Sequence, residues 1–206
     1  MFQTLLKKKL LPAVTLPDAD SALRVAEALL EGGLNVMEVT FRTSAATAAL
    51  TAVAKEFPEM KIGAGTILSP EQVSAAKDAG AQFGLAPGLN ISVIRAAKEL
   101  EFAFIPGVAT PSEIETALEL GCKMLKLFPV STLGGTDYLH SLQGPYHHTG
   151  VKFLAMGGIK PSNLKQYLEN EMVAAAGGSW MTSQKAIADK NFSEITEQVR
   201  KSAKII

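Results

Sequence analysis

The most informative stretch of the sequence is KMLKLFPVSTLGG, from Lys123 to Gly135. Its short apolar run, bounded by Pro129 and by a glycine pair, is typical of a buried strand that is covered on both faces. A lysine inside such a strand needs an explanation, because burial disfavours the charged form of an amine. Lys126 is therefore either a neutral amine that can condense with a ketone, or a lysine at a strand end whose ammonium group reaches water along its aliphatic stem.

Strand-like and helix-like segments alternate on both sides of this stretch. Eight apolar segments begin near Leu10, Asn35, Lys61, Gln82, Glu101, Lys123, Lys152 and Met172. Each is followed by a segment with helical spacing, and several of these begin at Ser, Thr, Asp or Asn and end at glycine. Such couplets indicate parallel strands joined by helical crossovers, and the simplest closed form is a (β/α)8 TIM barrel, an α/β fold. An open doubly wound sheet would usually carry a glycine after its first strand, and residues 11–21 contain none.

Length and composition favour one domain. The chain has 206 residues, of which 47% are hydrophobic, and this is enough for one large core. We expect a single barrel domain over residues 1–206, with a short amphipathic N-terminal helix. Lys plus Arg and Asp plus Glu both number 20, so no net charge attracts nucleic acid or an anionic membrane.

The ends of the chain and its cysteine content predict the compartment. A basic cluster precedes the first apolar stretch, but Pro12 interrupts that stretch, so it does not predict a secretory signal or a membrane span. The single cysteine, Cys122, excludes an internal disulfide and a thiolate metal cluster. The three histidines, His140, His147 and His148, lack carboxylates at ligand spacing and are expected to be exposed loop residues. We therefore expect a cytoplasmic protein that uses no metal and no cofactor.

The candidate site lies where a barrel of this kind carries out its chemistry, at the carboxyl ends of the strands. The second strand alternates apolar residues, which suit the helix layer, with Glu38, Thr40 and Arg42, which would face the interior. The same alternation on the sixth strand turns Lys126 inward. The barrel interior would then hold a carboxylate, a guanidinium and an amine, either as an ion-pair network that fills the space or as catalytic groups.

Glycine pairs follow the last two strands. Gly157 and Gly158 follow the seventh strand, and Gly177, Gly178 and Ser179 follow the eighth. Glycine lets backbone N–H groups approach a phosphate closely, and barrels commonly bind phosphate in these two loops. The alternative is that these glycines only allow tight turns.

The order of motifs along nearly the whole chain resembles the family of 2-keto-3-deoxy-6-phosphogluconate (KDPG) and 2-keto-4-hydroxyglutarate (KHG) aldolases. The segments that carry the resemblance are EVTFRT (Glu38–Thr43), GAGT (Gly63–Thr66), APGLN (Ala86–Asn90), IPGV (Ile105–Val108), KLFP (Lys126–Pro129) and GGSW (Gly177–Trp180). The resemblance implies a class I aldolase that cleaves KDPG to pyruvate and glyceraldehyde 3-phosphate, with KHG, which gives pyruvate and glyoxylate, as a second substrate of some members. It also implies a homotrimer that acts on small 2-keto acids.

Residue roles follow from the same resemblance. It implies that Lys126 forms the Schiff base with the keto carbon and that Glu38 acts as the general acid and base. Arg42 and Thr66 would hold the pyruvate carboxylate. The resemblance further implies that Pro87 and Phe128 form walls of the pyruvyl pocket. It implies phosphate binding by Gly157, Gly158, Gly178 and Ser179.

Two departures from the family sequence leave the substrate range open. Ala155 and Met156 replace a proline and a threonine whose hydroxyl is associated with recognition beyond the pyruvyl unit, and LFPVS, ending at Ser131, replaces FFPAE. A related aldolase could instead cleave another sugar acid, such as 2-keto-3-deoxy-6-phosphogalactonate. The sequence is also compatible with a different phosphate-binding barrel, such as an isomerase or a thiamine-phosphate type synthase, and with a barrel kept as an assembly or ligand-binding subunit.

Overall fold

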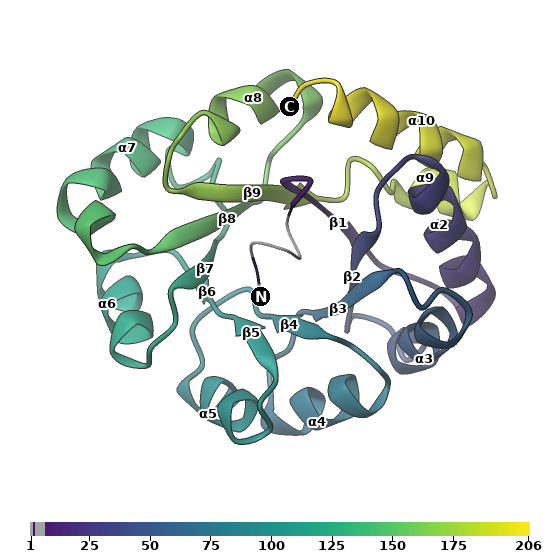
Figure 1. Ribbon diagram of the computed structural model, residues 1–206, viewed down its shortest axis with the longest axis horizontal. Coiled ribbons are helices and arrows are strands. Elements are labelled where there is room, and N and C mark those ends of the chain that lie inside the picture. Colours follow the sequence, from purple (N-terminus) through teal and green to yellow (C-terminus); the bar gives the residue numbers. More distant parts are fainter. Residues whose placement is uncertain (1, 3–6) are drawn as a thin grey trace.

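The protein is a ring of parallel strands surrounded by helices (Figure 1), and the computed structural model describes residue 2 and residues 7–206. The strands are β1 (Leu10–Val14), β2 (Val36–Thr40), β3 (Lys61–Gly65), β4 (Phe83–Leu85), β5 (Ala103–Ile105), β6 (Gly107–Val108), β7 (Met124–Leu127), β8 (Lys152–Met156) and β9 (Val173–Gly178). The expected α/β barrel is confirmed. The predicted N-terminal helix falls mainly on residues 1 and 3–6, which lie outside the described residues.

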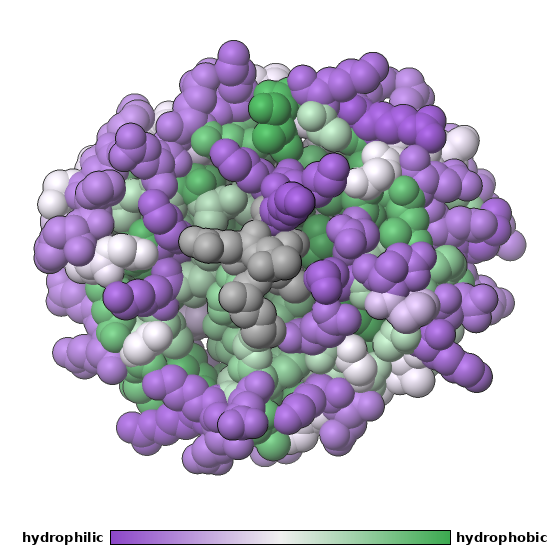
Figure 2. Space-filling model, viewed as in Figure 1, coloured by the Kyte–Doolittle hydropathy of each residue, from purple (hydrophilic) through white to green (hydrophobic). Residues whose placement is uncertain are grey.

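The helices follow the strands in the alternation that the sequence predicted. They are α2 (Ala19–Glu31), α3 (Ala46–Glu56), α4 (Pro70–Asp78), α5 (Ile91–Glu99), α6 (Pro111–Glu119), α7 (Gly135–Tyr146), the 3-10 helix η1 (His147–Thr149), α8 (Pro161–Leu168), α9 (Gln184–Ala188) and α10 (Phe192–Ala203). In Figure 2, hydrophilic residues gather around the margin of the molecule, over this helical layer. None of the described helices is long and apolar enough to cross a membrane.

The strand order around the ring is β5-β4-β3-β2-β1-β9-β8-β7-β6, so β1 and β9, the first and last strands, are neighbours. The strand expected from Glu101 onward is split at Pro106 into β5 and β6, which explains nine strands in place of eight. Proline has no N–H to donate, whereas the carbonyl oxygen of Pro106 accepts the N–H of Lys126 at 2.8 Å. Because β5 pairs with β4 and β6 pairs with β7, the two halves together close the ring.

Every residue of β2 and of β7 is buried, as expected for strands covered on both faces. Met37, Val39, Leu125 and Leu127 are fully buried, and Glu38, Thr40 and Lys126, from the alternate positions, line the hollow at one end of the ring. Parallel pairing aligns the carboxyl ends of all strands at one end of the ring, so their polar residues meet there.

Capping side chains fix where helices begin. The carboxylate of Asp18 accepts the N–H of Ser21 at 2.7 Å before α2, and Thr110 and Glu113 form a capping box at the start of α6. The three histidines are exposed, as predicted, but they lie in helices and not in a loop. His140 belongs to α7, and the other two form η1 because helical backbone continues past Pro145, inside α7.

Candidate active site

The centre of the site is a buried pair from β2 and β7. Lys126 Nζ lies 3.8 Å from Glu38 Oε1, and the two residues are only 5% and 1% exposed. Lys126 Nζ also lies 5.2 Å from the centroid of the Phe128 ring, within the range of a cation–π contact. A charge pair removed from water must be held in place by the fold, and here the two side chains come from strands on different arcs of the ring.

One oxygen of the carboxylate has no partner. Glu38 Oε2 is buried and accepts no hydrogen bond from any described residue. An unsatisfied buried carboxylate oxygen is costly, and proteins keep such groups where a ligand or a proton transfer uses them. The free oxygen of the Glu38 carboxylate is therefore available to accept a proton, or a hydrogen bond from a hydroxyl group, of a bound molecule.

Small residues make room for this carboxylate. A Cβ atom added to Gly65, at the end of β3, would lie 1.8 Å from Glu38 Oε1. Gly107 is the register partner of Lys126, and a Cβ there would lie 2.2 Å from the carbonyl carbon of Pro87. Glycine is therefore required at Gly65 to leave room for the Glu38 carboxylate, and at Gly107 to let the backbone of Pro87 pass this close.

The pair opens into a cavity of about 530 Å³ at the carboxyl ends of the strands, called the active-site cavity below. Eight of the ten residues predicted for the site line it: Glu38, Arg42, Lys126, Phe128, Gly157, Gly158, Gly178 and Ser179. The sequence therefore brings residues from β2, β7, β8 and β9 to one hollow, although they are far apart along the chain.

The other two predicted residues flank the pair without lining this cavity. Thr66 follows Gly65, which contacts the Glu38 carboxylate, and adopts a left-handed backbone conformation with φ of 60°. Pro87 lies against Gly107, beside the strand of Lys126. Left-handed backbone is strained for threonine, and such strain is concentrated at functional sites.

Two hydroxyl groups in the cavity form a link between β1 and β2. Thr15 Oγ1 and Thr40 Oγ1 are 2.8 Å apart, and both residues line the cavity. Gln184 Nε2 donates to the backbone oxygen of Thr15 at 2.8 Å and joins the start of α9 to this wall. The alternation that placed Thr40 inward would also have found Thr15 if it had been extended along the first strand.

The glycine loop after β8 packs tightly against the loop after β7. Gly157 and Gly158 have φ of 94° and 80°, and a Cβ on Gly158 would lie 2.5 Å from the side chain of Ser131. The N–H of Ser131 donates to the carbonyl oxygen of Gly157 at 3.1 Å, and its hydroxyl lies 3.0 Å from that of Tyr167. The loop after the lysine strand thus holds the glycine loop in place.

Backbone donors at this end of the cavity are available to a ligand. The amides of Gly158, Ile159 and Ser179 donate no hydrogen bond to another described residue. α8 begins shortly after Gly158 and Ile159, so the positive end of its dipole lies beside these two amides. Backbone N–H groups at a helix start favour an anion such as a phosphate.

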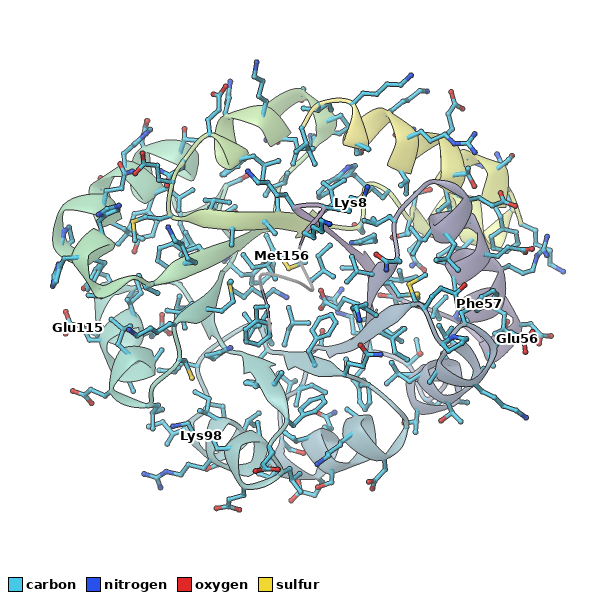
Figure 3. The ribbon with its side chains drawn as sticks, viewed as in Figure 1. Lys8, Glu56, Phe57, Lys98, Glu115 and Met156 are labelled. Carbon is cyan, nitrogen blue, oxygen red and sulfur yellow. The ribbon has the colours of Figure 1, made fainter. Side chains whose placement is uncertain are left out.

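Three further residues that line the cavity are Met156, Lys160 and Trp180. Met156, at the end of β8, is 4% exposed and points into the ring (Figure 3), where its Cε would lie 2.9 Å from a Cβ on Gly177. Trp180 lines the cavity and donates from Nε1 to Ser202 Oγ at 3.1 Å, so it does more than pack under the loop. Lys160, which no sequence pattern indicated, lies at the start of α8 beside the glycine pair.

The ionisable side chains that line the cavity are Glu38, Arg42, Lys126 and Lys160. Within the described part of the chain, no cluster of three or more His, Cys, Asp or Glu residues could hold a metal ion. An amine, a carboxylate with a free oxygen, two further cations and free backbone amides suit covalent capture of a ketone that bears anionic groups.

Comparison with known proteins agrees with this geometry. The family model for KDPG and KHG aldolase matches residues 2–198. A 2-dehydro-3-deoxy-phosphogluconate aldolase of Treponema pallidum is 40% identical over the whole chain and 97% of its own length. A KHG/KDPG aldolase of Escherichia coli is 38% identical over 93% of this chain and 89% of its own.

A solved structure resembles the fold closely as well. The KDPG aldolase of Legionella pneumophila, with pyruvate captured at low pH as a covalent carbinolamine intermediate, has a TM-score of 0.90 and 38% sequence identity. The alignment covers 93% of this chain and 92% of the Legionella chain. The protein therefore belongs to the KDPG and KHG aldolase family.

Proposed function

We propose that the protein is a class I aldolase that cleaves KDPG to pyruvate and glyceraldehyde 3-phosphate. The observation that carries the proposal is the buried contact of 3.8 Å between Lys126 Nζ and Glu38 Oε1 at the active end of the barrel. The covalent carbinolamine in the Legionella relative supports it, because a carbinolamine is the adduct of an amine with a ketone.

The chemistry begins at the amine. The neutral form of Lys126 attacks the keto carbon of the substrate, and the resulting carbinolamine takes up a proton and loses water to give a protonated imine. Glu38 removes the proton of the C4 hydroxyl, the bond between C3 and C4 breaks, and its electron pair moves to the imine to form an enamine. The aldehyde leaves, Glu38 returns the proton to C3, and water hydrolyses the resulting protonated imine to release pyruvate, the neutral amine and the proton taken up at imine formation.

The remaining residues of the site are proposed to bind the two anionic groups of the substrate and to form the walls of the pocket. Arg42 and Thr66 hold the carboxylate of the pyruvyl unit, because the guanidinium fork matches two carboxylate oxygens. Phe128 and Pro87 wall the pyruvyl pocket. At the other end, the backbone of Gly157, Gly158 and Gly178 and the hydroxyl of Ser179 bind the phosphate; the free amides in these loops support this part of the proposal.

KHG is proposed as a second substrate, since its cleavage gives pyruvate by the same steps and glyoxylate as the aldehyde. The KHG/KDPG name of the relative from Escherichia coli supports this extension. Met156 lines the cavity and supplies no hydroxyl group, so we expect selectivity between the two substrates to differ from that of relatives with a threonine at this position.

Reductive trapping tests the proposal. Incubation with pyruvate and borohydride is expected to add one carboxyethyl group, the reduced pyruvate adduct, to the peptide that contains Lys126, and an unmodified peptide would defeat the proposal. A phosphate-binding isomerase or synthase predicts no trapping and turnover that survives Lys126→Ala. A barrel without catalysis predicts no exchange of the pyruvate methyl protons in deuterated water.

We propose further that the protein works in the cytoplasm as a homotrimer. The family resemblance supports the trimer, and exposed Leu68 and Ile91, linked through the hydrogen bond of Asn90 Nδ2 to the Leu68 oxygen, offer an apolar contact. Light scattering should give three times the chain mass of 21.8 kDa, whereas a mass of one chain would contradict the trimer.

A further inference from the structure

We propose that Lys160 is a further substrate-binding residue, which holds the terminal phosphate and selects phosphorylated over unphosphorylated 2-keto-3-deoxy acids. The proposal rests on the proposed function, since it assigns a further residue to the same cavity. Three observations carry it: the position of Lys160 in the cavity, the way its backbone is held, and the distribution of charge around the cavity.

The position of Lys160 places a cation next to the free amides. It follows Gly157, Gly158 and Ile159 directly, and all four residues line the active-site cavity. It is the residue that immediately precedes α8, with φ of −139° and ψ of 163°, so its side chain leaves the chain where the helix begins. A lysine here adds a full charge to the partial charges of the helix start.

The backbone of Lys160 is held by the side chain of Asn163, in the first turn of α8. Asn163 Oδ1 accepts the N–H of Lys160 at 2.8 Å, and Asn163 Nδ2 donates to the carbonyl oxygen of Gly158 at 3.2 Å. One carboxamide therefore ties both ends of the short segment from Gly158 to Lys160. The lysine stem then starts from a defined point beside the glycine amides, which reduces the ordering cost of binding.

The charges around the cavity divide into a neutral centre and two outer cations. Lys126 and Glu38 face one another, which leaves Arg42 after β2 and Lys160 after β8. The proposed substrate carries two anionic groups, a carboxylate and a phosphate, and two cations that follow different strands match that number of charges. With Arg42 assigned to the carboxylate, Lys160 is the cation that remains for the phosphate.

No described carboxylate competes for this ammonium group. Lys160 forms no ion pair within the described residues, whereas Lys165, on the same helix, lies 3.9 Å from Glu169. Lys160 is exposed at the rim, so its ammonium group stays hydrated until an anion binds. A binding contribution at the upper end of the range for exposed ion pairs corresponds to about fivefold in affinity.

The test compares Lys160→Gln with Lys165→Gln, which removes the same charge from α8 outside the cavity. Pyruvate release from KDPG and from unphosphorylated 2-keto-3-deoxygluconate is measured for both variants and for the unchanged protein. Lys160→Gln should raise the KM for KDPG about fivefold with a much smaller change in kcat. The KM for the unphosphorylated acid should change far less, and Lys165→Gln should behave like the unchanged protein.

Several results would overturn the inference. An unchanged ratio of the two KM values in Lys160→Gln would do so, and so would an equal loss for both acids or an equal effect of Lys165→Gln. Lys160→Arg should restore most of the selectivity because it restores the charge, and failure to restore it would also count against the inference.

A binding measurement separates this inference from the proposed function. Inorganic phosphate is titrated calorimetrically into the unchanged protein and into Lys160→Gln, and we expect about fivefold weaker binding in the variant. If reductive trapping with pyruvate fails, the proposed function is wrong, and the titration still decides the role of Lys160. If trapping succeeds and phosphate binds both proteins equally, only the Lys160 inference falls.

Discussion

The two ends of the barrel both carry a cavity and both carry lysines, yet only one end is built for covalent chemistry. The cavity at the amino ends of the strands, called the amino-end cavity, has about 680 Å³ and is the larger of the two. The lysines that line it are Lys9, Lys98, Lys123 and Lys152. At the other end a single buried lysine faces a buried carboxylate.

The difference lies in what surrounds each amine. Lys152 Nζ donates to the backbone oxygen of Glu171 at 2.8 Å and is exposed enough to stay hydrated. Lys98 comes from α5, which lies outside the ring of strands (Figure 3). Lys126, in contrast, projects from a strand into the ring, where it is buried and a carboxylate is close. The size of a hollow is thus a poor guide to chemistry, and the burial and pairing of ionisable groups are better ones.

The largest contrast is expected from removing one lysine at each end. Lys126→Met should lower kcat for pyruvate release about 10³- to 10⁶-fold, because the nucleophile is lost, and should abolish trapping by borohydride. Lys152→Met, at the amino-end cavity, should leave kcat within about twofold. Steady-state assays with KDPG measure both, and comparable losses in the two variants would erase the distinction between the ends.

The next contrast concerns the acids. Glu38→Gln keeps the size of the buried side chain but removes the proton acceptor, so kcat should fall about 10²- to 10⁴-fold. Imine formation should persist, and borohydride with pyruvate should still label Lys126. Glu171→Gln, the matched change at the amino-end cavity, should have no comparable effect. Normal turnover in Glu38→Gln would show that this carboxylate is not the proton acceptor.

A third experiment tests the close packing that only the active end has. Gly65→Ala places a Cβ 1.8 Å from Glu38 Oε1, and the carboxylate must move because the strand cannot. We expect the free energy of unfolding to fall by about 1–3 kcal/mol, with a loss of activity. Gly144→Ala, in open space on α7, should instead raise it by up to about 1 kcal/mol. Urea denaturation measures both, and equal stability in the two variants would contradict the crowding.

The smallest effect is expected at the thiol of the amino-end cavity. Burial raises the pKa of Cys122, and the nearby Lys98 lowers it to a smaller extent. Less thiolate is then present at pH 8 than in the unfolded chain, so iodoacetamide should alkylate the native thiol several-fold more slowly. Lys98→Met should slow it further, since the opposing charge is removed. An unchanged rate in Lys98→Met would mean that this lysine does not act on the thiol.

The sequence predicts much of this molecule because a closed parallel barrel obeys simple rules. Strands covered on both faces appear as apolar runs, so Lys126 and Glu38 stood out, and a period of two was enough to place them inside. The carboxyl ends of parallel strands meet at one end, and this brought the glycine loops to the same cavity.

The features that the sequence did not reveal depend on contacts between distant segments. The break at Pro106 follows from its register with neighbouring strands, and the hydroxyl contact of Thr15 with Thr40 follows from the pairing of β1 with β2. Lys160 is one of many charged residues near a helix start, and only the path of the loop after β8 brings it to the cavity. Loop paths are decided by tertiary packing, which local sequence patterns do not encode.

The seam between β1 and β9 ties activity to closure of the ring. Leu10, Leu11 and Pro12 of β1 pair with Ala176, Gly177 and Gly178 of β9. During synthesis, the ring therefore cannot close until β9 has been made. Until then Lys126 and Glu38 belong to an open sheet whose interior face is exposed to water. Nascent chains that stop before β9 should therefore show no aldol cleavage, and the chain length at which activity first appears would report when the barrel closes.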